Sequence, residues 1–170
     1  MFKGKSKYGF FIVTFIGALI IFSMYVFKFI NSNEQINEQI TILTNNIDLK
    51  SESLNLFIII ICAVTLFILF ILNYIINKVI FKAISINVDS MKLATSILIS
   101  YNLEFILANL LVTYMDIKLL FLTIILNLIE IGLIVILLSE ELGRNKYKYC
   151  AIRLVLVIIN ATISNFTVIA

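Results

Sequence analysis

The chain has 170 residues, of which 62% are hydrophobic and 14% are charged, and its formal net charge is +3. Its mean hydropathy of +1.11 excludes an ordinary soluble domain, because globular domains are only about 45–50% apolar. With no His and only two Cys, the chain has no Ser-His-Asp or Cys-His nucleophile, no His-based metal site and no His haem ligand. We therefore expect neither a metal nor a cofactor.

Five apolar runs predict five membrane-spanning helices, and hence an all-α polytopic bundle that forms one membrane domain over residues 1–170. Each run has about the twenty residues that a helix needs to cross about 30 Å of hydrocarbon. The runs are Gly9–Phe27, Leu54–Ile76, Leu93–Met115, Leu119–Ser139 and Ala151–Ile169.

The segment 31–53, between the first two runs, predicts a short helix on the outer membrane surface or against the bundle. Ser32 and Gln35 have the spacing of a capping box. The apolar residues that follow recur on one helical face, at Ile36, Ile40, Leu43 and Ile47. The alternative is a solvated, Asn-rich loop whose periodicity is accidental.

The segment 77–92, between the second and third runs, predicts a basic amphipathic helix at the inner surface. Its apolar residues are three or four positions apart, at Ile80, Ile84, Val88 and Met91. Lys78, Lys82 and Lys92 can reach lipid headgroups, and anionic lipid stabilises each by about 1 kcal/mol. The helix is an interfacial connector or, alternatively, a coupling helix that touches a partner such as a nucleotide-binding subunit.

The distribution of Lys and Arg predicts an orientation with the N-terminus inside and the C-terminus outside. In that orientation ten of the thirteen basic residues lie on the inner side, and only Lys28, Lys50 and Lys118 lie outside.

Two carboxylates in the apolar runs are the main candidates for chemistry, because ionisable groups inside a membrane are energetically expensive. Glu104 lies thirteen residues before Ile117, the tip of the tight turn between the third and fourth runs, and Glu130 lies thirteen after it. An antiparallel hairpin therefore places both near the bilayer midplane. If they face each other, they would share a proton. The polar residues that we assign to this cluster with them are Asn102, Asn109, Asn127 and Asn160.

Three roles remain open for this cluster: hydrogen-bonding between helices, contact with a charged residue of another subunit, or movement of a proton or an ion. Arg153 lies about one turn inside the fifth run, so we expect it to extend to the inner surface rather than to reach Glu130. Gly17, Ala18 and Gly132 are the expected points of close helix approach.

The order of features in the second half of the chain resembles bacterial members of the Yip (Ypt-interacting protein) family of five-span membrane proteins. The resemblance covers residues 75–170 and rests on Ser100-Tyr101, Asp116-Ile117, Leu120-Phe121, Ile131-Gly132-Leu133 and the basic segment 144–148. It implies a non-catalytic membrane protein, and some such relatives are associated with ABC-type export systems.

No HExxH, GxGD, nucleophile-elbow or P-loop motif occurs in the sequence. We therefore expect a non-enzymatic accessory or interaction protein, multi-pass in the cell membrane and tied to an ABC-type export or self-protection system. Its expected partners are the lipid bilayer and other membrane subunits or copies of itself, and not nucleic acid. The alternatives are a small oligomeric ion- or proton-coupled transporter that uses Glu104 and Glu130, and an immunity protein against a membrane-active peptide.

Overall fold

The computed structural model describes residues 4–47, 51–114 and 119–169, which are almost entirely helical and contain no strand. The elements are α1 (Gly4–Ser32), α2 (Glu34–Ile47), α3 (Ser51–Ala83), α4 (Ser90–Tyr114), α5 (Leu119–Leu137), α6 (Ser139–Leu142), the 3-10 turn η1 (Gly143–Asn145) and α7 (Lys146–Ile169). The all-α prediction is therefore confirmed.

Three helical segments are each long and apolar enough to cross a membrane: Ser6–Ser32, Glu52–Ala83 and Ser90–Val112. A fourth crossing is possible because Phe121–Leu137 and Ser139–Ile163 pass the same test as a pair that is bent by 80°. The described part of the chain thus has three to four membrane-length segments. The presence of five spans, and the orientation with the N-terminus inside, stay predictions.

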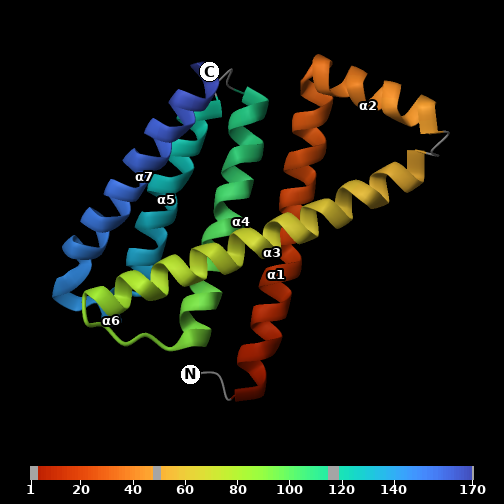
Figure 1. Ribbon diagram of the computed structural model, residues 1–170. Helices are drawn as coiled ribbons and strands as arrows, with labels where there is room; N and C mark the ends of the chain where they lie inside the picture. Colours follow the sequence, from red (N-terminus) through yellow and green to blue (C-terminus); the bar gives the residue numbers. More distant parts are fainter. Residues whose placement is uncertain (1–3, 48–50, 115–118, 170) are drawn as a thin grey trace.

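The bundle is built around α4, which packs between α1 and α5 (Figure 1). α7 runs antiparallel to α5 and packs along it, while α3 crosses the other long helices obliquely. The core lies where α3, α4, α5 and α7 meet, and it contains Phe81, Ile97, Ile134, Leu138 and Tyr149. Large apolar side chains also cover the outside of the helices, as at Ile12 and Val13 of α1, which suits a lipid environment better than water.

The predicted outer helix is present as α2, but its N-terminal cap differs from the prediction. Ser32 still belongs to α1, and its hydroxyl donates to the Phe29 carbonyl oxygen at 3.1 Å. Asn33 is the cap instead, because its Oδ1 accepts from the backbone N–H of Ile36 at 3.3 Å.

The separate inner helix predicted over 77–92 is wrong, because α3 continues through Ala83 and its end contains the first half of that segment. α3 ends in a Schellman motif, in which the N–H of Ile86 donates to the Phe81 carbonyl at 2.8 Å and that of Ser85 to the Lys82 carbonyl at 3.1 Å. Ser85 has a φ of 59°, in the left-handed region that ends a helix.

A non-helical connector then leads to α4, which begins at a clear capping residue. Oδ1 of Asp89 accepts from the backbone N–H groups of Lys92 and Met91, both at 2.9 Å. These bonds, that of Lys92 first, hold the pKa of the Asp89 carboxyl below its ordinary value. The apolar spacing that predicted one helix over 77–92 therefore belongs to the end of one helix, a connector and the start of another.

Two of the three expected close approaches occur. A Cβ on Gly17 would lie 3.0 Å from Oδ1 of Asn102, so α1 and α4 come close here, and the neighbouring Ala18 is fully buried. Gly132 has no atom within 4 Å of its Cβ position, so its assignment as a close approach is wrong.

Candidate functional site

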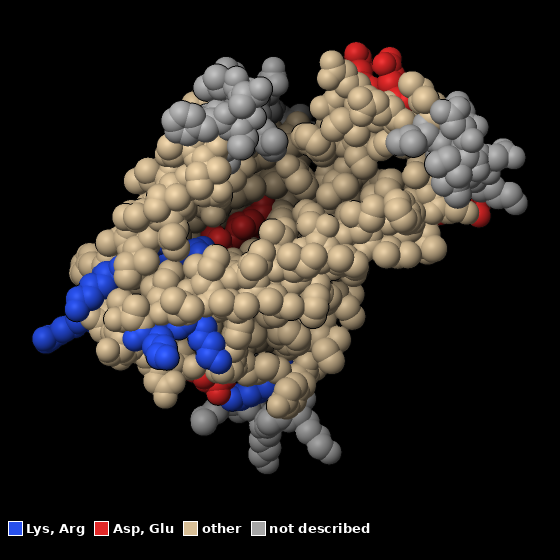
Figure 2. All heavy atoms as spheres, in the orientation of Figure 1, with Lys and Arg blue, Asp and Glu red and all other residues tan. Residues whose placement is uncertain are grey.

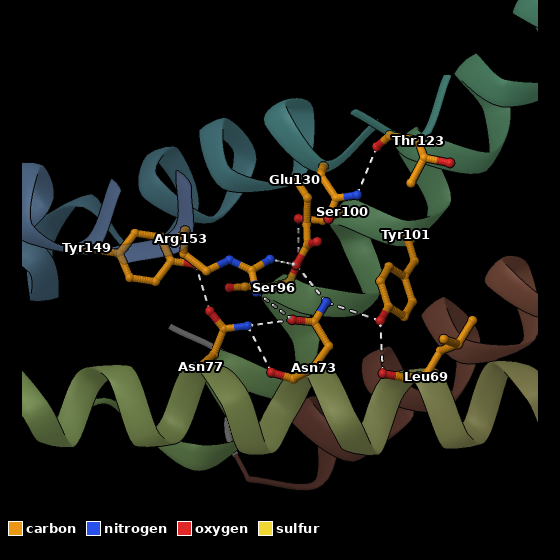
Figure 3. Close-up of polar contacts among 11 residues, drawn as sticks. Leu69, Asn73, Asn77, Ser96, Ser100, Tyr101, Thr123, Glu130, Tyr149 and Arg153 are labelled. Carbon is orange, nitrogen blue, oxygen red and sulfur yellow. Dashed lines mark hydrogen bonds and ion pairs between the residues drawn. The ribbon is translucent and has the colours of Figure 1, made fainter. Parts of the chain in front are cut away.

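A buried polar network joins four helices at the centre of the bundle (Figure 3). We define it by its six side chains: Asn73 and Asn77 of α3, Tyr101 of α4, Glu130 of α5, and Tyr149 and Arg153 of α7. Because its members come from four different helices, the network links α3 to the three helices that it crosses.

An ion pair between Glu130 and Arg153 is the strongest contact of the network. Nη2 of Arg153 lies 2.6 Å from Oε1 of Glu130, and the two side chains are only 8% and 6% exposed. The same Oε1 accepts from Nδ2 of Asn73 at 2.6 Å. Charge-assisted bonds of this length are strong, and burial makes the loss of either partner costly.

The expectation that Arg153 extends to the inner surface is wrong. Glu130 and Asn73 offer it a carboxylate and an amide oxygen inside the bundle, the latter 3.4 Å from its Nη1. A guanidinium group is most stable where a carboxylate compensates for its lost hydration.

The network continues from Asn73 in two directions. Nδ2 of Asn73 also donates to the Tyr101 hydroxyl, which in turn donates to the carbonyl oxygen of Leu69, both at 3.1 Å. On the other side, Nδ2 of Asn77 donates to Oδ1 of Asn73 at 2.7 Å, and the Tyr149 hydroxyl donates to Oδ1 of Asn77 at 2.6 Å.

Five members of the network were not among the predicted site residues, although the spacing of four of them carried a signal. Asn73 and Asn77 are four residues apart on one helix, and Tyr149 and Arg153 are four residues apart on another. Residues four apart lie on one helical face. Each pair therefore predicts a polar face on its own helix. Spacing within one helix does not predict which helices meet.

A cavity of about 720 Å³ opens beside the network and is lined by α3, α4, α5 and α7. Its wall is mainly apolar, with Leu69, Leu72, Ile76, Leu126 and Leu156 among its residues. Glu104, Glu130 and Arg153 also line it. Figure 2 shows a hollow in this face with acidic atoms at its bottom and basic atoms beside them. We call it the intramembrane cavity.

Glu104 lines this cavity and has an unsatisfied carboxyl oxygen. The residue is only 7% exposed, and its buried Oε1 has no hydrogen-bond partner among the described residues. Glu104 and Glu130 both line the cavity, but Glu130 is paired with Arg153, whereas no ion pair of Glu104 is found among the described residues. The turn at 116–118 from which their equal depth was inferred lies outside the described residues.

The four asparagines of the predicted cluster lie in two different places. Asn127 and Asn160 line the intramembrane cavity with Glu104. Asn102 and Asn109 instead face α1, where their Nδ2 atoms donate to the carbonyl oxygens of Thr14 at 3.0 Å and of Ile21 at 3.3 Å. The single cluster of six residues is therefore wrong for these two, because they point to the opposite side of α4.

The three lysines assigned to the inner segment also differ in their surroundings. Lys92 pairs with Glu141 and lies 4.0 Å from Glu140, so it joins the start of α4 to α6. Lys78 and Lys82 are exposed near the end of α3.

Within the described residues, no group of three or more His, Cys, Asp or Glu side chains could hold a metal ion. The chain matches no protein-family model, and no similar curated protein or solved structure was found. The chemistry of the site is thus the available guide to function: a neutral ion pair lies beside a carboxyl group whose Oε1 has no hydrogen-bond partner among the described residues.

Proposed function

We propose that the chain is a multi-pass protein of the cell membrane that acts without catalysis, by binding a polar group of another membrane protein in its intramembrane cavity. In this proposal it has five spans, with the N-terminus inside and the C-terminus outside. Two features support that topology. α1 begins and α7 ends at opposite ends of the bundle (Figure 1), and on the face drawn in Figure 2 basic atoms gather toward the end where α1 begins.

The observation that carries the proposal is the unpartnered Oε1 of Glu104. A buried carboxyl oxygen without a hydrogen bond destabilises the chain on its own, and a donor from outside relieves that penalty. Glu130 offers no such opening, since Arg153 and Asn73 already bind it.

The shape and wall of the cavity favour a membrane partner over a freely soluble one. Its volume of about 720 Å³ lies within the range of ligand pockets, and its wall is mainly apolar with a few converging polar groups. A transmembrane helix that carries Lys, Arg or Asn supplies both an apolar surface and a donor for Glu104.

Photo-crosslinking in native membranes tests this proposal. A photoreactive amino acid at Leu126, which lines the cavity, should give one discrete product with a second protein. The same group at Leu128, which is 45% exposed on the same helix and does not line the cavity, should not. Glu104→Leu should abolish the product, whereas Glu140→Leu, at a side chain that is 89% exposed, should leave it unchanged. Equal products from both positions would refute the proposal.

The first partner to seek is a subunit of an ABC-type export system, as the resemblance to Yip-like proteins implies. Stoichiometric recovery of a permease or an ATPase with the tagged chain in a gentle detergent would support an accessory role in export or self-protection. Recovery of the chain alone, as a homo-oligomer, would contradict that role.

The Glu104 carboxyl group also favours a second function, the movement of a proton or a cation. Asn127 and Asn160 line the same cavity and supply further polar groups. In that case liposomes containing the chain should dissipate a pH gradient, and Glu104→Gln should stop the dissipation. A protein that only binds a partner through Glu104 gives no flux in either form.

A further inference from the structure

A second cavity, which is basic, lies at the C-terminal end of α3, beside the turn that leads into α4. It has a volume of about 380 Å³ and is lined by Tyr74, Lys78, Phe81 and Lys82 of α3 together with residues 85–88, Ser90 and Leu93. We call it the turn pocket. It shares no lining residue with the intramembrane cavity.

Two lysines supply its positive charge. Lys78 and Lys82 are one helical turn apart, so their ammonium groups emerge from the same face. Neither forms an ion pair with a described residue, in contrast to Lys92 and Arg153. The Lys78 ammonium lies 5.6 Å from the centroid of the Tyr74 ring, which holds the side chain over the pocket wall. Figure 2 shows basic atoms gathered near this end of α3.

The turn adds neutral donors to this charge. Ser85, Asn87 and Ser90 line the pocket, and no hydrogen bond of their side chains is found among the described residues. They are held there by the Schellman motif at the end of α3 and by the Asp89 cap of α4. Two cations with several neutral donors form a site for a phosphate group.

The apolar surface beside the pocket shows what the phosphate is attached to. Ile71, Ile75 and Val79 lie eleven, seven and three residues before Lys82 on the same side of α3, and all three are exposed. We propose that the turn pocket binds the phosphate of an anionic phospholipid, whose acyl chains lie along these three residues. The proposal is independent of any partner in the intramembrane cavity.

Binding of fluorescently labelled lipid to the full chain in detergent micelles tests the proposal. Labelled phosphatidylglycerol should bind more tightly than labelled phosphatidylcholine, which has no net charge. Lys78→Gln with Lys82→Gln should weaken phosphatidylglycerol binding about 30-fold, the combined contribution of two lysines at an anionic surface. Arg144→Gln with Lys148→Gln removes the same charge from two exposed side chains outside the pocket and should change binding less than threefold.

Three results would overturn the proposal. Equal weakening by both double variants means that diffuse surface charge attracts the lipid. Equal affinity for the two lipids means that the pocket does not bind an anion. Displacement of the label by glycerol phosphate as readily as by unlabelled lipid means that a free phosphate compound is the ligand. Lys78→Arg with Lys82→Arg keeps both charges and should retain the preference, which separates a lost site from a misfolded chain.

Discussion

Replacing Arg153 by Met removes the counter-ion of Glu130 while keeping an apolar side chain of similar length. Glu130 then keeps only its bond to Asn73 at 2.6 Å, in a side chain that is 6% exposed. Removing one partner of a buried ion pair costs about 3–5 kcal/mol. The expected fall in melting temperature is about 6–20 °C for a chain of this length.

A double-mutant cycle shows whether the charge, rather than packing, is responsible. Glu130→Met alone leaves the Arg153 guanidinium buried without a counter-ion and should destabilise the chain by a similar amount. The double variant removes both charges, so it should lose far less than the sum of the two single variants. The free energy of coupling between the two positions should therefore exceed about 2 kcal/mol.

The chain contains its own reporter for this measurement. Cys62 is 2% exposed, so a maleimide dye that fluoresces on reaction with a thiol reports its exposure on unfolding. Cys150, which is half-buried, is replaced by Ser so that only Cys62 reacts. Arg144→Met, at an exposed residue of η1, is the matched control and should change stability by less than about 0.5 kcal/mol. Additive losses in the cycle, or an Arg153→Met variant as stable as the parent, would refute the ion pair as a determinant of the fold.

Three further predictions use the same melting assay. Tyr149→Phe removes the hydroxyl that donates to the buried amide oxygen of Asn77, so it should destabilise the chain by about 1–3 kcal/mol. Tyr147→Phe, at a residue that is 85% exposed, should have no effect. Equal effects of the two variants would contradict the hydrogen bond. Ser85→Gly should stabilise it by about 1 kcal/mol, because φ is 59° and Gly adopts that conformation without strain; a loss of stability would contradict the Schellman assignment. Gly17→Val should separate α1 from α4 and lower stability, while Gly132→Val, where the space is open, should be tolerated; the reverse order would contradict the packing of α1 on α4.

The helices were predictable because apolar length is a local property of the sequence. Each of the five apolar runs falls within the described helices, apart from Met115, which lies outside them, and a break after Leu137 near the end of the fourth run. The helix in the outer loop was also predictable, since its apolar face recurs over twelve residues, from Ile36 to Ile47. Only its cap was assigned one residue too early, because Ser32 and Asn33 are both good capping residues and α1 continues through the first of them.

The inner segment could not be predicted from periodicity because a helix that ends and one that begins can keep the same apolar spacing across the break. The local signal was Asp89, a strong capping residue just before α4. Ser85 gave no signal for the end of α3, because the left-handed conformation that it adopts is usually marked by Gly. Treating Asp89 as a helix cap, in place of the apolar spacing, would have predicted the start of α4 correctly.

The network was predictable only in part, for a physical reason. Sequence distance identified Glu104 and Glu130 as candidates, but the position of Arg153 depends on the oblique crossing of α3, which supplies Asn73. A basic residue one turn inside a membrane helix can extend to the surface or pair inside the bundle, and the energies of the two states differ by the contacts available inside. Those contacts are non-local.

The buried charges of the described bundle do not balance, and this imbalance is the strongest reason to look for function at Glu104. Three Glu or Arg side chains line the intramembrane cavity, and of these two are carboxyl groups and one is a guanidinium group. Arg153 neutralises Glu130 in direct contact, and within the described residues no second basic side chain forms an ion pair with Glu104. A proton, a cation or a donor from another chain must therefore accompany this carboxyl group. Glu130 and Arg153 alone would suffice to link the helices. Replacement of the third group, Glu104, is therefore what distinguishes partner binding from transport.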